Sequence, residues 1–575
     1  MSQLLTSLTN DQKIAQLQGE WLRKLIDGKK LSLDSCRKRI PNGIGHLAQF
    51  SSSVDLGPNE LKAVIDDLQD YLIATTGVPA ILHEEAISGF AAKGATTLPQ
   101  QIGMGCTWNP ELLKGNTAMS AQQMRAVGAT QALSPMLDIC RDSHWGRIEE
   151  SFGEEPYLIA KMGLAFVEGL QGKDLTKGVA ATTKHFAGYA GGTDDKKVFY
   201  EETLLPHEAT VRFGNAQSAM AGYHAIDGIP CSANKKLLDT ILRDKLGFDG
   251  VVISDFWSIK QVYTKYKYAK DDKDAAVKSI NAGMDVELPF GMSFPYLKEA
   301  LKEGTVTQET LDKSVERVLV LKSRLGLFNS APKNNETIVF DTPENRERAY
   351  ESACQSIVML KNNGVLPIDT QEEISILLTG EYADKIPHGG GAAEVVGYDH
   401  VTMLTALKEV YGEKLSYIEN PTDEDLKTFS HVIYSAGTYD SEGWDKSYDF
   451  PETVNKAIKN IASLNKHTIV AVSSGSGMNM TEWNADIAGL IYSWYPGQIG
   501  FKAFAEIVAG MTNPSGKLPI TIEKKFEDSP GFGYLPEDAA LYTGWEEDHK
   551  IIDPIIDVKY DEGIFVGYRW YEHKA

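Results

Sequence analysis

Short apolar runs alternate with amphipathic stretches along residues 1–330, and this alternation indicates the fold. Five runs have the composition of buried strands: GVPAIL (77–82), GVAATTKHF (178–186), SAMAGYH (218–224), GVVISD (250–255) and AGMDVEL (282–288). Stretches with helical periodicity lie between them, at 109–127 and 155–171. Strand–helix alternation on this scale predicts parallel β/α units. The length favours an N-terminal (β/α)8 TIM-type barrel over residues 1–330.

The chain start lacks the basic-then-apolar order of a signal peptide and predicts a capped helix instead. Thr9 or Asn10 can serve as the cap, and Ile14, Leu17 and Trp21 follow at helical spacing.

Polar residues terminate four of the predicted barrel strands. His83, Glu84 and Glu85 follow the first, Lys184 and His185 end the second, Tyr223 and His224 end the third, and Asp255 ends the fourth. In a parallel barrel the carboxyl ends of all strands share one rim, where active sites form. The pattern therefore predicts a polar pocket at that rim.

The second half of the chain predicts another α/β unit. The polar, proline-containing segment around 329–346 predicts a linker at 331–345. Runs at 374–380, 431–437, 467–475 and 487–494 read as parallel strands, with helices at 457–465 and 501–510. We expect a doubly wound α/β sandwich over 346–530. The remaining residues, 531–575, are expected to form a tail that packs back on the domains.

Composition and charge argue against several classes of partner and site. The 575 residues carry 57 Lys and Arg against 79 Asp and Glu, a net charge of −22. This balance argues against nucleic acid or an anionic membrane as a partner and fits a neutral substrate. The five cysteines form no CxxC pair, so neither a zinc site nor a disulfide framework is expected. No signal peptide or membrane span is evident, so we expect a cytoplasmic protein, or a periplasmic or secreted one if a signal was removed.

Asp255 is the first candidate for chemistry. An aspartate after a strand also serves as a helix cap, and that alternative stays open. Arg147, Lys184 and His185 are potential cations at the same rim, and we expect them to hold the pKa of Asp255 down. An ionised carboxylate of this kind acts as a nucleophile or an electrostatic stabiliser.

A series of motifs in register resembles glycoside hydrolase family 3. They are HEEAISGF (83–90), GATTLPQQIGMGCTWNPELL (94–113), RDSHWGRIEESFGEEPYLIAKMG (141–163), KHFAGY (184–189), MAGYHAIDGIPCSANKKLLDTILRDKLGFDGVVISDF (220–256), SIVMLKNNGVLP (356–367), WYPGQIG (494–500) and NPSGKLPITI (513–522). The resemblance covers nearly the whole chain.

The resemblance implies roles for individual residues. Asp255 would be the nucleophile. The hydroxyls of the bound sugar would be held by Glu85, Arg147, Lys184 and His185, and Met220 and Tyr223 would line the same pocket. The alternatives are structural: a salt-bridging arginine, a buried Lys–His network, a surface glutamate, and core packing for the last two residues.

The general acid/base is expected in the second domain. Family members that use a histidine carry it in a KHFxGH pattern, and this chain has Tyr189 there. Other members use a glutamate in an EGxDR-like loop, which resembles Glu442-Gly443-Trp444-Asp445-Lys446. Glu442 would then be the acid/base, its pKa raised by Trp444. An exposed loop glutamate is the alternative, with Asp440 and Asp445 as rival acids.

The family implies a retaining, exo-acting β-glycosidase that needs no cofactor and acts on small oligosaccharides or aryl and alkyl glycosides. Glu85, where glucosidase-like members usually carry Asp, and the segment IDGIPCSAN (226–234) favour a β-xylosidase. A β-glucosidase is the alternative. Two residues depart from these patterns: Ser88 stands where the family often has His, and Phe256 stands where glucosidases often have Trp, with Trp257 immediately after it.

Two other classes compete with this interpretation. A nucleotide-binding oxidoreductase would use the glycine-rich segments 389–395 or 473–480, but neither spells GxGxxG. A catalytically silent sugar-binding protein on the same fold is the second.

Many family members continue into a fibronectin type III-like domain, so this chain is expected to be a short member or a truncated one. The surface that such a domain covers would then be available for homodimer formation.

Overall fold

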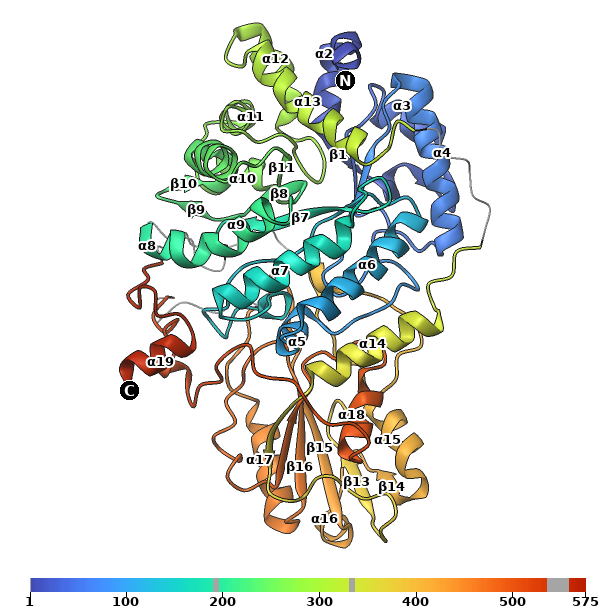
Figure 1. Cartoon of the computed structure of the whole chain (residues 1–575), viewed down its shortest axis with the longest axis vertical. Coiled ribbons are helices and arrows are strands. Elements are labelled where there is room, and N and C mark those ends of the chain that lie inside the picture. The colour runs from blue at the N-terminus through green and yellow to red at the C-terminus, as the bar shows by residue number, and fades with distance from the viewer. Residues whose placement is uncertain (1, 190–195, 330–336, 535–557) are drawn as a thin grey trace.

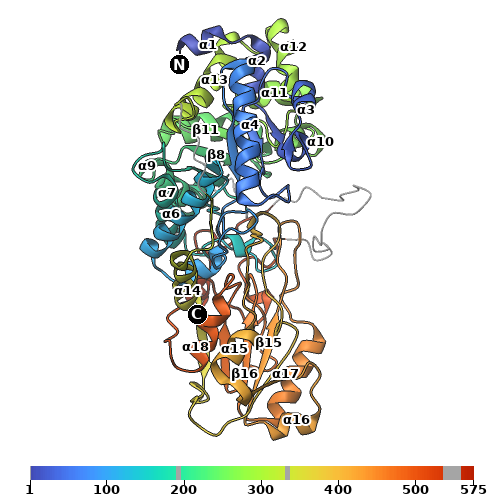
Figure 2. The ribbon, with the colours of Figure 1, turned by 90° about the vertical axis from the view of Figure 1, so that its right-hand side faces the viewer.

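The computed structural model describes residues 2–189, 196–329, 337–534 and 558–575. Two α/β bodies are stacked along the long axis (Figure 1), and a side view shows the same division (Figure 2). The N-terminal body runs from blue to yellow-green, and the second body is mostly orange. Helix α14 (Pro343–Ser356) begins the second half of the chain beside the first body.

The first body is built on a curled parallel sheet in the order β1-β4-β5-β6-β7-β8-β11. These strands are β1 (Gly19–Trp21), β4 (His46–Ala48), β5 (Ile81–Glu84), β6 (Gln131–Ala132), β7 (Ala180–Phe186), β8 (Ser218–Ala221) and β11 (Val251–Ser254). Val286 forms a parallel bridge to Ile253 of β11, and its neighbour Glu287 forms one to Gln18, just before β1. Residues 286–287 therefore occupy the eighth place in the ring, and the predicted TIM-type barrel is confirmed.

Helices connect successive barrel strands and surround the sheet. They include α3 (Leu33–Arg39), α4 (Pro58–Thr76), α6 (Pro110–Ala126), α7 (Pro156–Gln171), α9 (Leu204–Arg212), η5 (Lys236–Lys245), α10 (Ser258–Thr264), α11 (Asp272–Asn281) and α13 (Gln308–Arg324). Asn109 caps α6 and Glu155 caps α7 through side-chain acceptors, and proline occupies the first turn of each. These two helices match the predicted segments closely.

Strand β11 shows why an apolar run in the sequence predicts a buried strand. Val251, Val252 and Ile253 are fully buried, as expected for a strand with the barrel interior on one face and helices on the other. The segment 282–288 contributes only the two bridges instead of a full strand. Strands β1, β4 and β6 have two or three residues each, too few to show a periodic pattern.

The predicted N-terminal helix is correct only in its first half. Helix α2 (Asn10–Gln16) begins after the cap Thr9, whose side chain accepts a hydrogen bond from the Gln12 amide. Leu17 ends the helix, and Trp21 lies in β1, not on a helix. Helix α2 and strand β1 both bury apolar side chains. The spacing of Leu17 and Trp21 therefore could not show that the helix ends and a strand begins between these two residues.

The second body contains a six-stranded sheet in the order β12-β17-β16-β15-β13-β14. Its strands are β12 (Val358–Asn362), β13 (Ile376–Thr379), β14 (Leu415–Tyr417), β15 (His431–Gly437), β16 (Thr468–Ser473) and β17 (Gly489–Tyr492). Only β12 pairs antiparallel within this sheet. The connecting helices include α15 (Met403–Tyr411), α16 (Asp423–Thr428), α17 (Glu452–Leu464) and α18 (Gly500–Val508). This is the predicted doubly wound domain, with β12 and β14 added.

The chain order reverses between β13 and β15, where ligand sites of such sheets form. The loop after β15 leaves this edge and touches the barrel. The Lys446 amide donates to the His144 carbonyl at 3.0 Å, and Arg147 forms an ion pair with Glu442. The switch point of the second sheet therefore faces the rim of the barrel.

The domain bounds 1–330, 331–345, 346–530 and 531–575 stay predictions. Part of the linker, 330–336, and part of the tail, 535–557, lie outside the described residues. The described end of the chain contacts the barrel, where Glu562 pairs with Arg141 at 2.8 Å and the Tyr568 amide donates to Glu154. None of the helices in the described ranges has the length and apolar character needed to cross a membrane.

Candidate active site

A cavity of about 410 Å³ lies at the barrel rim, against the second domain. We call it the rim cavity. All eight residues proposed from the sequence line it: Glu85, Arg147, Lys184, His185, Met220, Tyr223, Asp255 and Glu442. It is also lined by Trp21, Gln49, Ser52, Leu133, Phe256, Trp257, Gly391 and Ala392. Parallel strand ends and one loop of the second domain thus bring together residues far apart in the sequence.

Asp255 follows β11 and is almost fully buried. Its Oδ1 accepts the Phe256 amide at 2.7 Å, and its Oδ2 lies 3.5 Å from Nε2 of His185. Within the described part of the chain, Oδ2 has no hydrogen-bond partner. One carboxylate oxygen is therefore fixed by the backbone, while the other is buried beside His185 without a hydrogen-bond partner in the described part of the chain.

The pKa of Asp255 is raised to about 7, not lowered as the sequence led us to expect. Burial is the main cause and the negative charge of Glu442 adds to it, while Arg147 and Lys184 act in the opposite direction. Those two cations do not serve Asp255 directly, because each forms its ion pair with another carboxylate.

His185 is held by a second carboxylate. Its Nδ1 lies 2.7 Å from Oδ2 of Asp138, which also accepts the His185 amide at 3.2 Å. Burial, with help from Arg147 and Lys184, lowers the pKa of His185 well below its usual value. The ring is therefore neutral, with its proton on Nδ1 and the acceptor Nε2 facing Asp255. The expectation that His185 acts as a cation beside Asp255 is wrong for this reason.

Lys184 and Glu85 form an ion pair across the strand ends. Nζ of Lys184 lies 2.9 Å and 3.1 Å from the two oxygens of Glu85. The lysine is buried, and burial raises the pKa of Glu85 against the opposing charge of Lys184. The pair offers fixed donors and acceptors to a ligand with hydroxyl groups, which need such partners once they leave water.

Arg147 joins the barrel to the loop that carries Glu442. Its Nε and Nη2 donate to Glu150 at 2.8 Å and 2.7 Å, and its Nη1 donates to Oε1 of Glu442 at 2.9 Å. The guanidinium is buried, while the side chain of Glu442 keeps 34% of its surface exposed. The arginine thus aims Glu442 at the cavity.

The pKa of Glu442 is lowered, which corrects the expected effect of Trp444. Burial works to raise it, but the positive charge of Arg147, with that of Lys184, outweighs burial. Trp444 is 44% exposed and does not line the rim cavity, so it provides little apolar cover for the carboxyl group.

The rival acids lie elsewhere. Asp440 is fully buried, pairs with Lys446 at 2.7 Å and accepts the Gly475 amide at 3.0 Å. Asp445 accepts the Gly146 amide at 3.3 Å. Neither residue lines the rim cavity. Both stabilise the loop that presents Glu442.

Sequence reasoning missed several residues of the site. Asp138 and Glu150, which hold His185 and Arg147, lie outside the predicted strands, although the i, i+3 spacing in RIEE was a signal for Glu150. Gln49 and Ser52 follow the unpredicted strand β4. The glycine-rich segment 389–395 reaches the cavity through Gly391, where an added Cβ would lie 2.9 Å from Cβ of Glu442. The glycines of this segment permit the close approach of its backbone to Glu442. This approach accounts for the glycines without the phosphate-binding role that a nucleotide-binding protein would give them.

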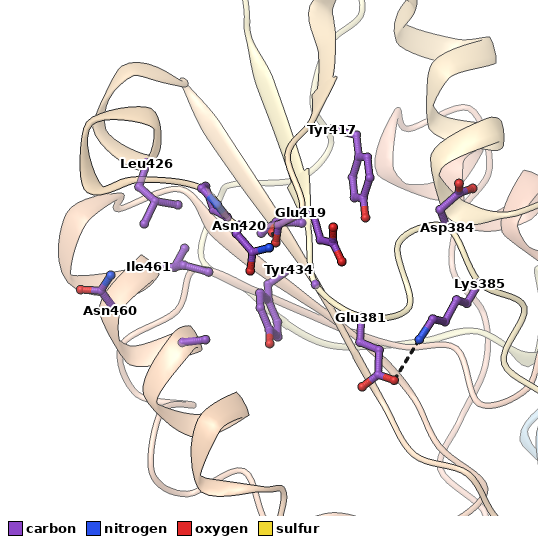
Figure 3. A pocket seen from close by; sticks show the side chains of 14 residues that line it. Glu381, Asp384, Lys385, Tyr417, Glu419, Asn420, Leu426, Tyr434, Asn460 and Ile461 are labelled. Carbon is purple, nitrogen blue, oxygen red and sulfur yellow. Dashed lines mark hydrogen bonds and ion pairs between the residues drawn. The ribbon is translucent and has the colours of Figure 1, made fainter.

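A larger cavity of about 640 Å³ lies within the second domain (Figure 3). Tyr417 and Tyr434 line it beside several carboxylates, and Glu381 pairs with Lys385 at 3.1 Å. None of its lining residues comes from the barrel. The polar strand ends converge on the rim cavity instead, so the rim cavity is the candidate active site.

Among the described residues, no group of three or more His, Cys, Asp or Glu side chains is arranged to hold a metal ion.

A TIM-type barrel joined to a doubly wound domain, with a polar cavity that contains two carboxyl groups between them, indicates a two-domain enzyme. Two family descriptions match the chain: "Glycosyl hydrolase family 3 N terminal domain" over residues 9–321 and "Glycosyl hydrolase family 3 C-terminal domain" over residues 357–568. The chain therefore belongs to glycosyl hydrolase family 3.

Named relatives agree with this assignment. A beta-xylosidase of Formosa agariphila is 32% identical over 79% of this chain and 70% of that protein. A beta-glucosidase of Bacteroides ovatus is 28% identical over 85% of this chain and 68% of that protein. The chain spans 62% to 77% of the lengths of eight curated relatives.

Solved structures share the fold. A mutant beta-glucosidase from Listeria innocua in complex with laminaribiose superimposes with a TM-score of 0.83 at 26% identity, covering 98% of this chain and 81% of the other.

Proposed function

We propose that the protein is a retaining β-glycosidase that releases one sugar from the non-reducing end of small β-glycosides. The observation that carries this proposal is the pair of carboxyl groups in the rim cavity. Asp255 comes from the barrel with a free oxygen, and Glu442 comes from the second domain on the Arg147 guanidinium. Retaining hydrolysis needs two such groups on opposite sides of the scissile bond.

In the proposed mechanism Oδ2 of Asp255 attacks the anomeric carbon while Glu442 protonates the departing glycosidic oxygen. A glycosyl ester of Asp255 forms and the leaving group takes the proton of Glu442. Glu442 then removes a proton from water, which cleaves the ester and returns the sugar with its configuration retained. Glu85, Lys184, His185 and Arg147 hold the sugar hydroxyls, and Met220 and Tyr223 shape the cavity. No step calls for a metal or organic cofactor.

Proton placement matters for this mechanism. In the ligand-free protein burial and Glu442 raise the pKa of Asp255 to about 7, while Arg147 and its neighbours lower that of Glu442. Below about pH 7 the pair therefore carries one proton, and in the ligand-free protein this proton is on Asp255. The positive charge that develops on the sugar stabilises ionised Asp255, so the proton passes to Glu442 as the reaction begins.

A β-xylosidase is the preferred specificity and a β-glucosidase is the second candidate. Glu85 is one methylene longer than the aspartate usual in glucosidase-like members, and Lys184 fixes its carboxylate at 2.9 Å. Its added length takes the space of the C6 hydroxymethyl group of glucose. Phe256 stands where glucosidases often carry Trp. Its ring packs edge-on against that of Trp21, with 5.7 Å between the ring centroids.

Hydrolysis of a panel of 4-nitrophenyl glycosides tests the proposal: β-xyloside, β-glucoside and α-arabinofuranoside. We expect one β-glycoside to be clearly preferred, with retained configuration by NMR of the first product. Replacement of Asp255 by Asn should lower kcat by several orders of magnitude. Sugar binding without hydrolysis of any glycoside would instead favour the silent sugar-binding alternative.

A further inference from the structure

A second cavity adjoins the rim cavity on one side only. It has a volume of about 580 Å³, and we call it the adjoining groove. Gln49, Ser52, Glu85 and Gly391 line both spaces. The groove then continues along the barrel segments 51–55 and 91–93 and past Glu394 and Val396 of the second domain. None of the residues that follow β7, β8 or β11 lines it.

The position of the groove relative to Asp255 follows from the strand order. In the barrel ring β5 is third and β11 is seventh, so Glu85 and Asp255 stand on opposite sides of the mouth. A sugar attacked at its anomeric carbon by Asp255 therefore turns its far end, C3 and C4, toward Glu85. The groove begins at Glu85 and leads away from Asp255, beyond the non-reducing end of that sugar.

The groove wall is held by hydrogen bonds to a buried carboxylate and carries several hydroxyl groups. Both oxygens of buried Glu84 hold the loop after β4, accepting the Ser51 hydroxyl at 2.7 Å and the Ser52 hydroxyl at 3.0 Å. The buried Oγ of Ser53, which also lines the groove, has no hydrogen-bond partner among the described residues. Asp55 and Lys93 form an exposed ion pair along the same wall.

We infer that the adjoining groove binds a second sugar residue, linked to C4 of the sugar in the rim cavity. The inference rests on the proposed function and extends it: a substrate that carries a second sugar beyond this position loses two sugars together instead of one. The Ser53 hydroxyl has no partner among the described residues, and the Ser52 hydroxyl, which donates to Glu84, can still accept a hydrogen bond from the added sugar. Val54 and Val396 supply apolar surface for the ring of that sugar. The groove exceeds the rim cavity in volume, so a cavity that accepts one ring leaves room for another. The protein then releases a disaccharide from a suitably extended substrate.

Product analysis with matched substrates tests this inference. The substrates are the preferred 4-nitrophenyl monoside and the corresponding β-1,4-linked 4-nitrophenyl bioside, either xylobioside or cellobioside. We expect nitrophenol and the intact disaccharide as the first products of the bioside, with kcat/KM at least equal to that of the monoside. Release of a monosaccharide and a nitrophenyl monoside first, or no cleavage of the bioside by a protein that cleaves the monoside, would overturn the inference and leave the proposed function intact.

A blocking variant separates the groove from the rim cavity. Val396 is 63% exposed and lines only the groove, so Val396→Trp fills the groove. This variant should lower kcat/KM for the bioside by about tenfold, which corresponds to about 1.4 kcal/mol, and leave kcat/KM for the monoside unchanged. Val339→Trp is the matched control, because Val339 is 61% exposed and lines neither space. Equal effects of the two variants would count against the groove.

A binding measurement keeps the inference testable if no glycoside is cleaved, the result that would defeat the proposed function. Calorimetry with the Asp255→Ala protein should show xylobiose or cellobiose binding at least about tenfold more tightly than the monosaccharide. Adding Val396→Trp should abolish that difference. A difference that survives Val396→Trp would place the second sugar outside the groove and contradict the inference.

Discussion

At the scale of single residues, the site is governed by how three carboxylates share two cations. Lys184 pairs with Glu85, and Arg147 pairs with both Glu150 and Glu442. Asp255 is left with a neutral histidine and a backbone amide. This distribution raises the pKa of Asp255 and lowers that of Glu442, so a single proton belongs to the pair.

The pH dependence of kcat/KM follows from that single proton. The reactive form has one proton on the pair, and this proton leaves as the pH rises through about 7, the raised pKa of Asp255. A second proton binds in the acid range, where the lowered pKa of Glu442 lies. We expect a bell-shaped profile with its basic limb near neutral pH, measured with the preferred aryl glycoside. A kcat/KM that keeps rising above neutral pH would contradict this assignment.

Glu85 is expected to select the sugar. Glu85→Asp shortens the acid by one methylene and opens space for a hydroxymethyl group. The ratio of kcat/KM for β-glucoside over β-xyloside should rise by about 10-fold, since one methylene in a pocket is worth about 1–3 kcal/mol. Glu85→Gln, which keeps the length, serves as the control and should not shift the ratio in this direction. An unchanged ratio in the aspartate variant would remove Glu85 from the specificity argument.

At the scale of elements, the strand ends and one glycine-rich loop set the geometry. The alternation of apolar and polar runs predicted the barrel, the second sheet and the strand ends that carry Glu85, Lys184 and Asp255. Strands β1, β4 and β6 escaped prediction because two or three residues show no period. The partners of Asp255 also escaped, because the choice of which cation binds which carboxylate depends on three-dimensional distances that no spacing encodes.

Gly391 tests the importance of the loop. Gly391→Ala adds a Cβ 2.9 Å from Cβ of Glu442 at a φ of +63°. We expect kcat to fall by about 10- to 100-fold, because a displaced acid/base group loses its alignment. Gly412→Ala is the matched control, since its φ is +56° and nothing lies within 4 Å of the added Cβ.

Both variants should lose about 1 kcal/mol of unfolding free energy, because alanine is strained at positive φ. Denaturant melts and aryl glycoside kinetics on the two proteins separate stability from alignment. Equal activity in the two variants would show that the loop does not position Glu442.

At the scale of the whole molecule, the proposed chemistry depends on both domains. The barrel supplies Asp255, and the switch point of the second sheet supplies Glu442 through its contact with Arg147. The resemblance in register found both carboxylates, but only the folded chain shows that they line one cavity. Homodimer formation and the cellular compartment stay predictions.

Glu442→Ala tests the contribution of the second domain. Loss of the acid should lower kcat by about 10²- to 10⁴-fold for poor leaving groups and much less for activated aryl groups, which need no proton. Azide should restore turnover and give a glycosyl azide, because a small anion fits where the carboxylate was. Glu381→Ala, an exposed second-domain glutamate away from the rim cavity, is the control. A uniform loss for all leaving groups, with no azide rescue, would transfer the acid role to another residue.

The account is tested most directly by trapping the glycosyl–enzyme ester. A 2-deoxy-2-fluoro glycoside of the preferred sugar, with a fluoride or dinitrophenolate leaving group, should inactivate the protein and add one sugar mass. Peptide mass spectrometry is expected to place that sugar on Asp255, and the Asp255→Asn protein should remain unlabelled. A label on any other carboxylate, or a fully active protein that forms no ester, would contradict the assignment of Asp255 as the nucleophile that faces Glu442 across the sugar.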